Sequence, residues 1–70
     1  MNMQSELKEV ASRIKELREI AGLTPSEMSL KTEVTLDEYL ALERGETDFS
    51  FTFIYKCAAV FGVEIKDLLE

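Results

Sequence analysis

The chain has 70 residues, of which 46% are hydrophobic and 31% are charged, and its formal net charge is −6. A chain of this length buries only a small core, which leaves little room for an enclosed active site. It has no histidine and one cysteine, Cys57, so it lacks the commonest general base and metal ligand and cannot close an internal disulfide. We therefore expect no enzyme, no metal site and no cofactor, and we expect Cys57 to be a small buried core residue.

The sequence gives no sign of a membrane or export segment. No apolar run approaches the roughly 18 residues that a membrane span needs, and the first ten residues carry no apolar signal region. No repeat or Gly/Ser-rich linker divides the chain. We therefore expect one domain over residues 1–70, in a cytoplasmic protein that does not contact a membrane.

The first predicted element is a helix over residues 5–21. Its apolar residues recur at intervals of three and four and form one stripe: Leu7, Val10, Ala11, Ile14, Leu17 and Ala21. Ser5 is expected to cap the start of this helix, and Gly22 is expected to end it in the left-handed conformation.

Two capped helices follow, and they are predicted over residues 25–32 and 36–44. Thr24 with Glu27 has the sequence pattern of a capping box, and Thr35 with Glu38 repeats it. The side chains expected to point inward are Met28, Tyr39 and Leu42. The two helices are separated by a turn of about four residues, which is the spacing of a helix-turn-helix.

The last two helices are predicted over residues 51–61 and 65–69. Ser50 is expected to cap the first of them, and Gly62 to end it. The inward residues are expected to be Phe51, Phe53 or Ile54, Cys57, Ala58 and Phe61, followed by Val63, Ile65, Leu68 and Leu69 in the short helix. All five elements are helical, so the predicted fold class is all-α.

The order of these elements resembles the Cro and phage-repressor type of helix-turn-helix domain, the XRE family. The segments that carry the resemblance are IKELREIAGLTPSEMSLKTEVT, LALERGE and AAVFGVEIKDLL, and it covers nearly the whole chain. It implies a five-helix repressor-like bundle that contains a helix-turn-helix. It also implies that the helix from Pro25 crosses the DNA backbone and that the helix from Leu36 lies in the major groove.

The resemblance also assigns roles to individual residues. In this family an arginine near the end of the first helix forms a partly buried ion pair with a glutamate that matches Glu43 here, and the arginine matches Arg18. The residues expected to contact DNA are Thr24, Pro25, Ser26, Lys31, Thr35, Leu36, Asp37, Leu40, Ala41 and Arg44.

Several of these residues depart from the family pattern. Pro25 stands where a glutamine commonly bonds phosphate and base, and proline has neither an amide side chain nor an N–H. The base-reading positions hold Leu36, Asp37 and Ala41, none of which can make the bidentate contact that Arg, Asn or Gln makes to a purine. Glu33 replaces the turn glycine, where a positive φ is expected to cost about 1 kcal/mol.

The charge of the helix-turn-helix conflicts with DNA binding. Between residues 24 and 48 the chain has two cations and seven anions, a balance of −5. A surface of that sign repels phosphate. We therefore expect binding to double-stranded DNA to be weak, or to need a homodimer or another component.

Apolar residues on the same unit suggest an alternative. Leu36 and Leu40 lie four residues apart, and together with Phe49 they are candidates for a contact patch for a protein. Two functions therefore remain open. One is the DNA-binding domain of a transcriptional regulator, which the fold favours. The other is a helix-turn-helix scaffold reused for dimerisation, for binding a protein partner, or as a regulatory domain joined to another domain beyond Glu70, which the charge and the patch favour.

Overall fold

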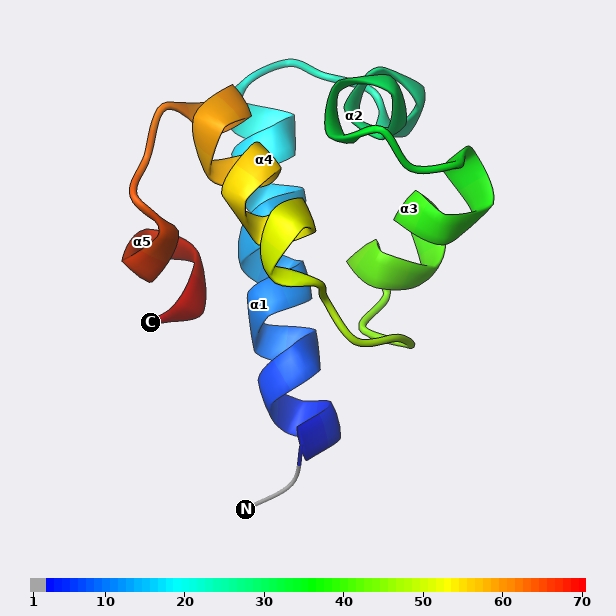
Figure 1. The fold of residues 1–70 in the computed structure, drawn as a ribbon. Helices are drawn as coiled ribbons and strands as arrows, with labels where there is room; N and C mark the ends of the chain where they lie inside the picture. Colours follow the sequence, from blue (N-terminus) through cyan, green and yellow to red (C-terminus); the bar gives the residue numbers. More distant parts are fainter. Residues whose placement is uncertain (1–2) are drawn as a thin grey trace.

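The computed structural model describes residues 3–70, with side chains described from Glu6 onwards. These residues form five α-helices and no strand: α1 (Met3–Ile20), α2 (Pro25–Thr32), α3 (Leu36–Glu43), α4 (Phe51–Phe61) and α5 (Ile65–Leu69). Helix α1 runs along the bundle with α4 beside it, while α5 lies on one side and α2 and α3 lie on the other (Figure 1). The predicted all-α, five-helix repressor-like fold is confirmed. Within the described residues, no helix has the length and apolar content needed to cross a membrane.

The start of α1 differs from the prediction. The helix begins at Met3, so Ser5 lies inside it and the expected cap was wrong. Ser5 is followed by the strong helix formers Glu6, Leu7 and Lys8, so it is tolerated inside the helix and does not mark its start. At the other end Gly22 adopts φ 73° and ends the helix, as expected. Ala21 lies after the last helical residue and is exposed, so its place in the buried stripe was also wrong.

The caps explain why α2 and α3 begin where they do. At α2 the Glu27 N–H donates to the Thr24 hydroxyl over 3.1 Å, and the Thr24 N–H donates to the Glu27 carboxylate over 2.9 Å. This is a complete capping box, as predicted. At α3 the Glu38 N–H donates to the Thr35 hydroxyl, but the Glu38 carboxylate accepts from that hydroxyl rather than from the Thr35 N–H. The second capping box is therefore only half made, and that part of the prediction was wrong.

The core takes side chains from every helix. Its buried hydrophobic residues are Val10, Ala11, Ile14, Met28, Tyr39, Leu42, Phe53, Ile54, Cys57, Ala58 and Leu68. Burying each of the larger ones stabilises the fold by about 1.5–3 kcal/mol relative to leaving it in water. Cys57 is fully buried, and burial raises the pKa of its thiol to about 12, so the thiol stays neutral and packs as a small apolar group.

Three apolar residues near α4 and α5 do not lie where the sequence placed them. Phe51 was expected to point inward but is 72% exposed, because the first residue of α4 lies about a quarter turn from the centre of the buried face. Phe49, expected on a contact patch, instead turns inward and stacks on Phe53 with ring centroids 5.9 Å apart. Leu69 is 51% exposed, because it follows the buried Leu68 and points to a different side of a short helix.

A close backbone approach fixes the loop after α3 against α1. Gly45 has φ 71°, and a Cβ atom there would lie 2.8 Å from Cγ of Lys8 and 3.0 Å from its Cα. Only glycine fits this conformation and this space. The approach holds the C-terminal end of α3 near the first turns of α1.

Candidate nucleic-acid interface

The turn between α2 and α3 has the geometry of a helix-turn-helix. Glu33 adopts φ 61°, which is the left-handed conformation expected for the position of the turn glycine. The Glu33 N–H donates to the Leu30 carbonyl, and the Val34 N–H donates to the Ser29 carbonyl over 3.1 Å. These bonds satisfy the last carbonyls of α2 and turn the chain directly into Thr35, the cap of α3.

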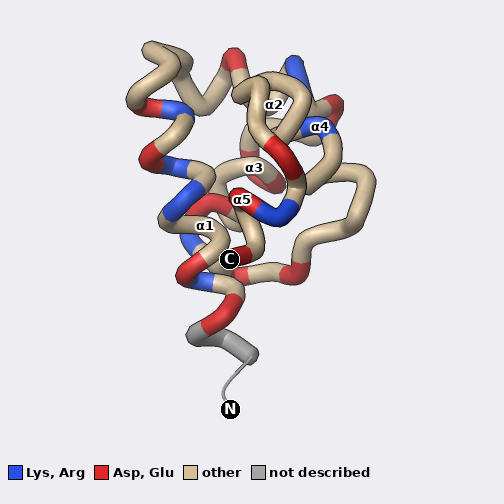
Figure 2. Tube along the Cα trace, turned by 90° about the vertical axis from the view of Figure 1, so that its left-hand side faces the viewer, with Lys and Arg blue, Asp and Glu red and all other residues tan. Residues whose placement is uncertain are grey.

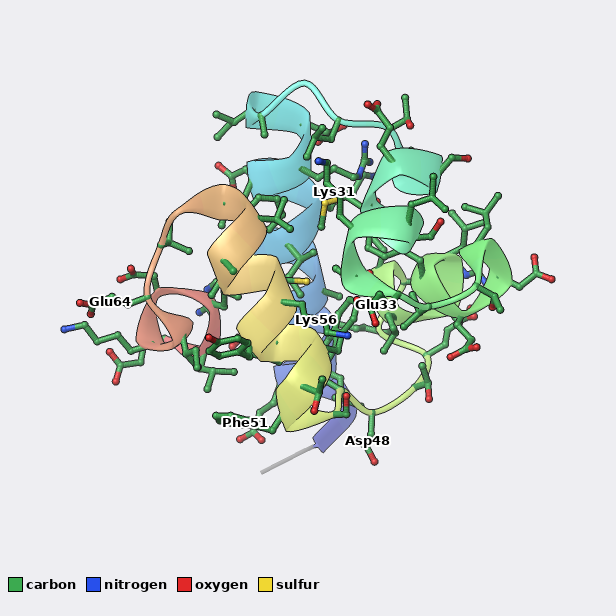
Figure 3. The ribbon with its side chains drawn as sticks, turned by 45° about the horizontal axis from the view of Figure 1, so that its top comes forward. Lys31, Glu33, Asp48, Phe51, Lys56 and Glu64 are labelled. Atoms are coloured by element: carbon green, nitrogen blue, oxygen red, sulfur yellow. The ribbon has the colours of Figure 1, made fainter. Side chains whose placement is uncertain are left out.

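An ion pair attaches this turn to the rest of the bundle. The Nζ atom of Lys56, on α4, lies 3.1 Å from a carboxylate oxygen of Glu33. Figure 3 shows the two labelled side chains next to each other between α4 and the turn. Glu33 is largely exposed, so this pair stabilises the fold by less than about 1 kcal/mol.

A stronger pair orients α3 itself. The Arg18 guanidinium donates to both carboxylate oxygens of Glu43, over 3.0 Å from Nε and 2.9 Å from Nη2. Its remaining nitrogen, Nη1, donates to the Leu23 carbonyl over 2.8 Å. Both charged side chains are about nine-tenths buried, and the hydrogen bond to Glu43 raises the pKa of Arg18. The structure thus brings together the two residues that the resemblance paired, and the guanidinium links α1, the loop before α2 and the end of α3.

Tyr39 lies beside this pair and anchors α3 in the core. Its side chain is fully buried, and its ring packs at a tilt against Phe53 with centroids 6.2 Å apart. Its hydroxyl is the buried side-chain polar atom without a hydrogen-bond partner among the described residues. Burial, followed by the nearby Glu43 carboxylate, raises the pKa of this phenol above its usual value, so it remains neutral. The sequence predicted an inward tyrosine but gave no sign that its hydroxyl lacks a partner.

The helix N-termini that would face phosphate are occupied by carboxylates of the chain itself. The Glu27 side chain accepts from the Thr24 N–H at the start of α2, and this bond, followed by the one with the Thr24 side chain, lowers the pKa of Glu27. At α3 the Thr35 hydroxyl, an expected phosphate ligand, is bonded to the Glu38 carboxylate over 3.2 Å. A helix N-terminus favours an anion, and here an internal anion takes that place. Glu27 and Glu38 thus occupy the two N-termini and were missing from the expected contact set, although their capping pattern was visible in the sequence.

The expected DNA-contacting residues all lie on α2, α3 or their caps, but they differ in exposure. Thr24, Ser26, Lys31, Thr35, Leu36, Asp37 and Arg44 are exposed, whereas Pro25, Leu40 and Ala41 are half-buried. The exposed members are therefore mainly short polar or acidic side chains, together with Leu36 and the two cations Lys31 and Arg44.

Few positive charges are free on this surface. Arg44 is held by Glu46, with 3.0 Å from its Nε to the carboxylate, and the bond raises the pKa of Arg44 and lowers that of Glu46. Lys31 makes no ion pair with any described side chain. Figure 2 shows acidic and basic positions interspersed along α1, whereas residues 24–48 carry the balance of −5. Lys31 is thus the main cation that this unit can offer to phosphate.

A groove beside α3 has the same acidic character. It lies between α3 and the loop that follows, with a volume of about 480 Å³. Its charged lining residues within the described part of the chain are Asp37, Glu38 and Asp48, with no lysine or arginine. The described residues contain no group of three or more His, Cys, Asp or Glu side chains placed to hold a metal ion.

The expected apolar patch of Leu36, Leu40 and Phe49 is not present as a set. Leu36 is 41% exposed, but Leu40 is half-buried and Phe49 packs against the core. The most exposed leucine of this unit is Leu30 on α2, which was not among the residues expected on the patch. The alternative partner surface therefore loses one of its three members.

Comparison with known proteins places this geometry in a family. The helix-turn-helix family pattern matches residues 14–68. The chain is 37% identical over 57 residues to an uncharacterised HTH-type transcriptional regulator of Archaeoglobus fulgidus, covering 81% of each chain. It is 32% identical over 57 residues to another such regulator, from Methanocaldococcus jannaschii, covering 81% of this chain and 86% of that one.

Two solved structures share the fold. The restriction-modification controller protein C.AhdI from Aeromonas hydrophila superposes with a TM-score of 0.85 and 25% identity, covering 91% of this chain and 97% of that chain. The clp gene regulator ClgR from Corynebacterium glutamicum gives a TM-score of 0.85 at 19% identity, covering 99% of this chain and 70% of that chain, and this likeness concerns the fold alone. With the family pattern spanning most of its length, the chain belongs to the XRE-type helix-turn-helix family.

Proposed function

We propose that this chain is the DNA-binding domain of a transcriptional regulator. The observation that carries the proposal is the orientation of α3, which the Arg18–Glu43 pair and the buried Tyr39 fix against α1 and α4. In this arrangement α2 crosses the DNA backbone and α3 lies in the major groove. The relatives described as HTH-type transcriptional regulators support this function rather than an enzymatic one.

The proposed contacts divide into positioning contacts and base contacts. Hydrogen bonds and charge contacts to the DNA backbone come from the start of α2, the cap of α3 and the two cations, namely Thr24, Ser26, Thr35, Lys31 and Arg44, whereas Pro25 can give only van der Waals contact there. Contacts to base edges come from Leu36, Asp37, Leu40 and Ala41. Apolar side chains fit a thymine methyl, and a carboxylate can accept from the cytosine amino group. The proposed readout therefore uses methyl contacts more than bidentate hydrogen bonds.

Electrostatics make the proposed binding weak for a single copy. Each phosphate that a protein neutralises contributes about 0.9 to the salt slope of binding, and this face offers few free cations. We propose that a homodimer, which would present two recognition helices to two half-sites, supplies the missing affinity. The rival use as a protein-interaction surface through Leu36, Leu40 and Phe49 is weaker, because Phe49 is packed against Phe53.

Fluorescence anisotropy tests the proposal directly. Labelled duplexes are first selected from a random pool on the purified protein, and the affinity for the selected duplex is then compared with that for a scrambled duplex. The double variant Asp37→Asn with Glu38→Gln should bind DNA more tightly, because it removes two negative charges from the face of α3. The matched control is Glu9→Gln with Glu16→Gln, which removes the same charge from exposed positions on α1. Equal effects of the two variants, or no preference for the selected duplex, would contradict the assigned interface.

A further inference from the structure

An apolar groove lies at the end of the bundle where the first turns of α1, the loop before α4, the start of α4 and the end of α5 meet. Its volume is about 410 Å³. Its apolar lining consists of Leu7, Val10, Phe49, Phe51, Ile54 and Leu69. Phe51 and Asp48, which both line it, lie at the same end of the molecule in Figure 3.

Two of these apolar side chains are open to solvent. Phe51 is 72% exposed and Leu69 is 51% exposed, although Ile54 and Val10 beneath them are buried. An aromatic ring and a leucine next to a hollow of this size form the kind of concave apolar surface that binds a partner side chain. The groove thus has a buried floor and two exposed apolar walls.

The charges on the groove have one sign. Among the residues that the structure describes, its charged lining residues are Glu6 and Asp48, with no lysine or arginine. Neither carboxylate makes an ion pair with a described side chain. A second copy of this chain, with its charge of −6, would bring the same carboxylates against them, so like charges would meet. A basic partner meets complementary charges instead.

We propose that this groove binds an amphipathic, basic helix of another protein. Apolar side chains on one face of that helix, spaced three and four residues apart, cover Phe51 and Leu69. Its lysine or arginine side chains lie against Glu6 and Asp48. This binding surface goes beyond DNA recognition and does not depend on it, since of its lining residues just Asp48 and Ser50 also border the groove beside α3.

A synthetic peptide of about 14 residues, roughly four helical turns, serves as the probe. It carries leucines at helical spacing and lysines elsewhere, and a matched peptide has glutamate in place of every lysine. Fluorescence anisotropy with the full chain should show saturable binding of the lysine peptide and none of the glutamate peptide. Amide and methyl NMR shifts on titration should concentrate at Phe51, Ile54 and Leu69.

Paired charge reversals separate the groove from general attraction to an acidic protein. Glu6→Lys with Asp48→Lys should weaken binding of the lysine peptide at least about tenfold, because the complementary charges are lost. Asp37→Lys with Glu38→Lys changes the net charge equally on the α3 face and should have an effect below about twofold. Phe51→Ala should weaken binding without lowering the melting temperature, since its ring is mostly in water.

Three results would overturn the proposal. Equal losses in the two double variants would show that the peptide senses only net charge. NMR shifts centred on α2 and α3 would place it on another surface. A reversible dimer in sedimentation equilibrium that Phe51→Asp abolishes, with the lysine peptide failing to bind the wild-type chain, would show that a second copy occupies the groove.

Discussion

Arg18 and Glu43 lie 25 residues apart in the sequence and form a two-point ion pair, with nitrogen–oxygen distances of 3.0 and 2.9 Å. The third contact of the guanidinium is a hydrogen bond to the Leu23 carbonyl, in the loop that leads into α2. The pair is buried and holds α3 in position, and it is not part of the surface that would meet DNA. Removing this pair by mutation therefore tests the stability of the fold without changing the charge of the DNA-contacting surface.

Glu43→Ala should lower the free energy of unfolding by about 3 kcal/mol, because it leaves the Arg18 charge buried without its partner. Glu46→Ala is the matched control, since it also removes a carboxylate that is bound to an arginine, but in an exposed pair. Its effect should be several times smaller. Urea melts of both variants followed by circular dichroism measure the difference, and similar losses would mean that the buried pair does not stabilise α3.

Tyr39→Phe should raise the free energy of unfolding by about 1 kcal/mol. The tyrosine hydroxyl is buried without a hydrogen-bond partner, so deleting it removes a desolvation penalty while the ring keeps its packing against Phe53. Tyr55→Phe makes the same chemical change at a side chain that is 59% exposed and should leave stability nearly unchanged. Thermal or urea melts distinguish the two. A loss of stability in Tyr39→Phe would reveal that the hydroxyl is bonded in solution.

Glu33→Gly should stabilise the domain relative to Glu33→Gln by about 1 kcal/mol. Both variants lose the charge that pairs with Lys56, but only glycine adopts φ 61° without strain. The comparison therefore isolates the backbone cost of a non-glycine residue in the turn. If the two variants melt at the same denaturant concentration, the turn is not strained by its side chain.

Local chemistry made most of the fold predictable from the sequence. Thr24, Ser50 and Gly22 act within one helical turn of themselves, so their effect on helix ends does not depend on the rest of the bundle. The start of α1 was misplaced because serine is accepted both as a cap and within a helix, and Ser5 lies within the helix here. The Arg18–Glu43 pair was predicted from the family resemblance, because no local sequence pattern connects residues so far apart.

The orientation of the aromatic residues near α4 could not be read from the sequence. Phe49 and Phe51 lie on either side of the cap Ser50. Phe49 is in the loop, where helix periodicity predicts no direction, and Phe51 is the first residue of α4, where the predicted direction is uncertain by the few residues that separate helix boundaries. Which of the two enters the core depends on the ring of Phe53, on which Phe49 stacks. Phe49 is therefore absent from the expected patch, and Phe49 and Phe51 both line the groove at the end of the bundle.

Glu27→Gln should strengthen DNA binding while leaving the fold intact. Glutamine can still accept the Thr24 N–H and preserve the capping box, but it removes the negative charge from the N-terminus of α2. Because the hydrogen bonds to Thr24 lower the pKa of Glu27, the wild-type carboxylate stays charged until the pH falls below the usual carboxylate range, so the repulsion persists at neutral pH. The charged Glu27 carboxylate also stabilises the fold. This contribution is present above the ordinary pKa of glutamate and is lost as the pH falls through the lowered pKa.

Anisotropy titrations against duplex DNA at pH 7 and low salt measure this effect, and circular dichroism verifies that the variant is folded. The matched control is Glu19→Gln, which removes one exposed carboxylate from α1. It should change affinity much less, because its charge lies outside the unit formed by α2 and α3. The salt slope should stay shallow in both variants, since neither adds a cation that could displace a counterion from phosphate. A gain in affinity for Glu19→Gln as large as that for Glu27→Gln would mean that total charge, rather than the carboxylate at the start of α2, limits binding.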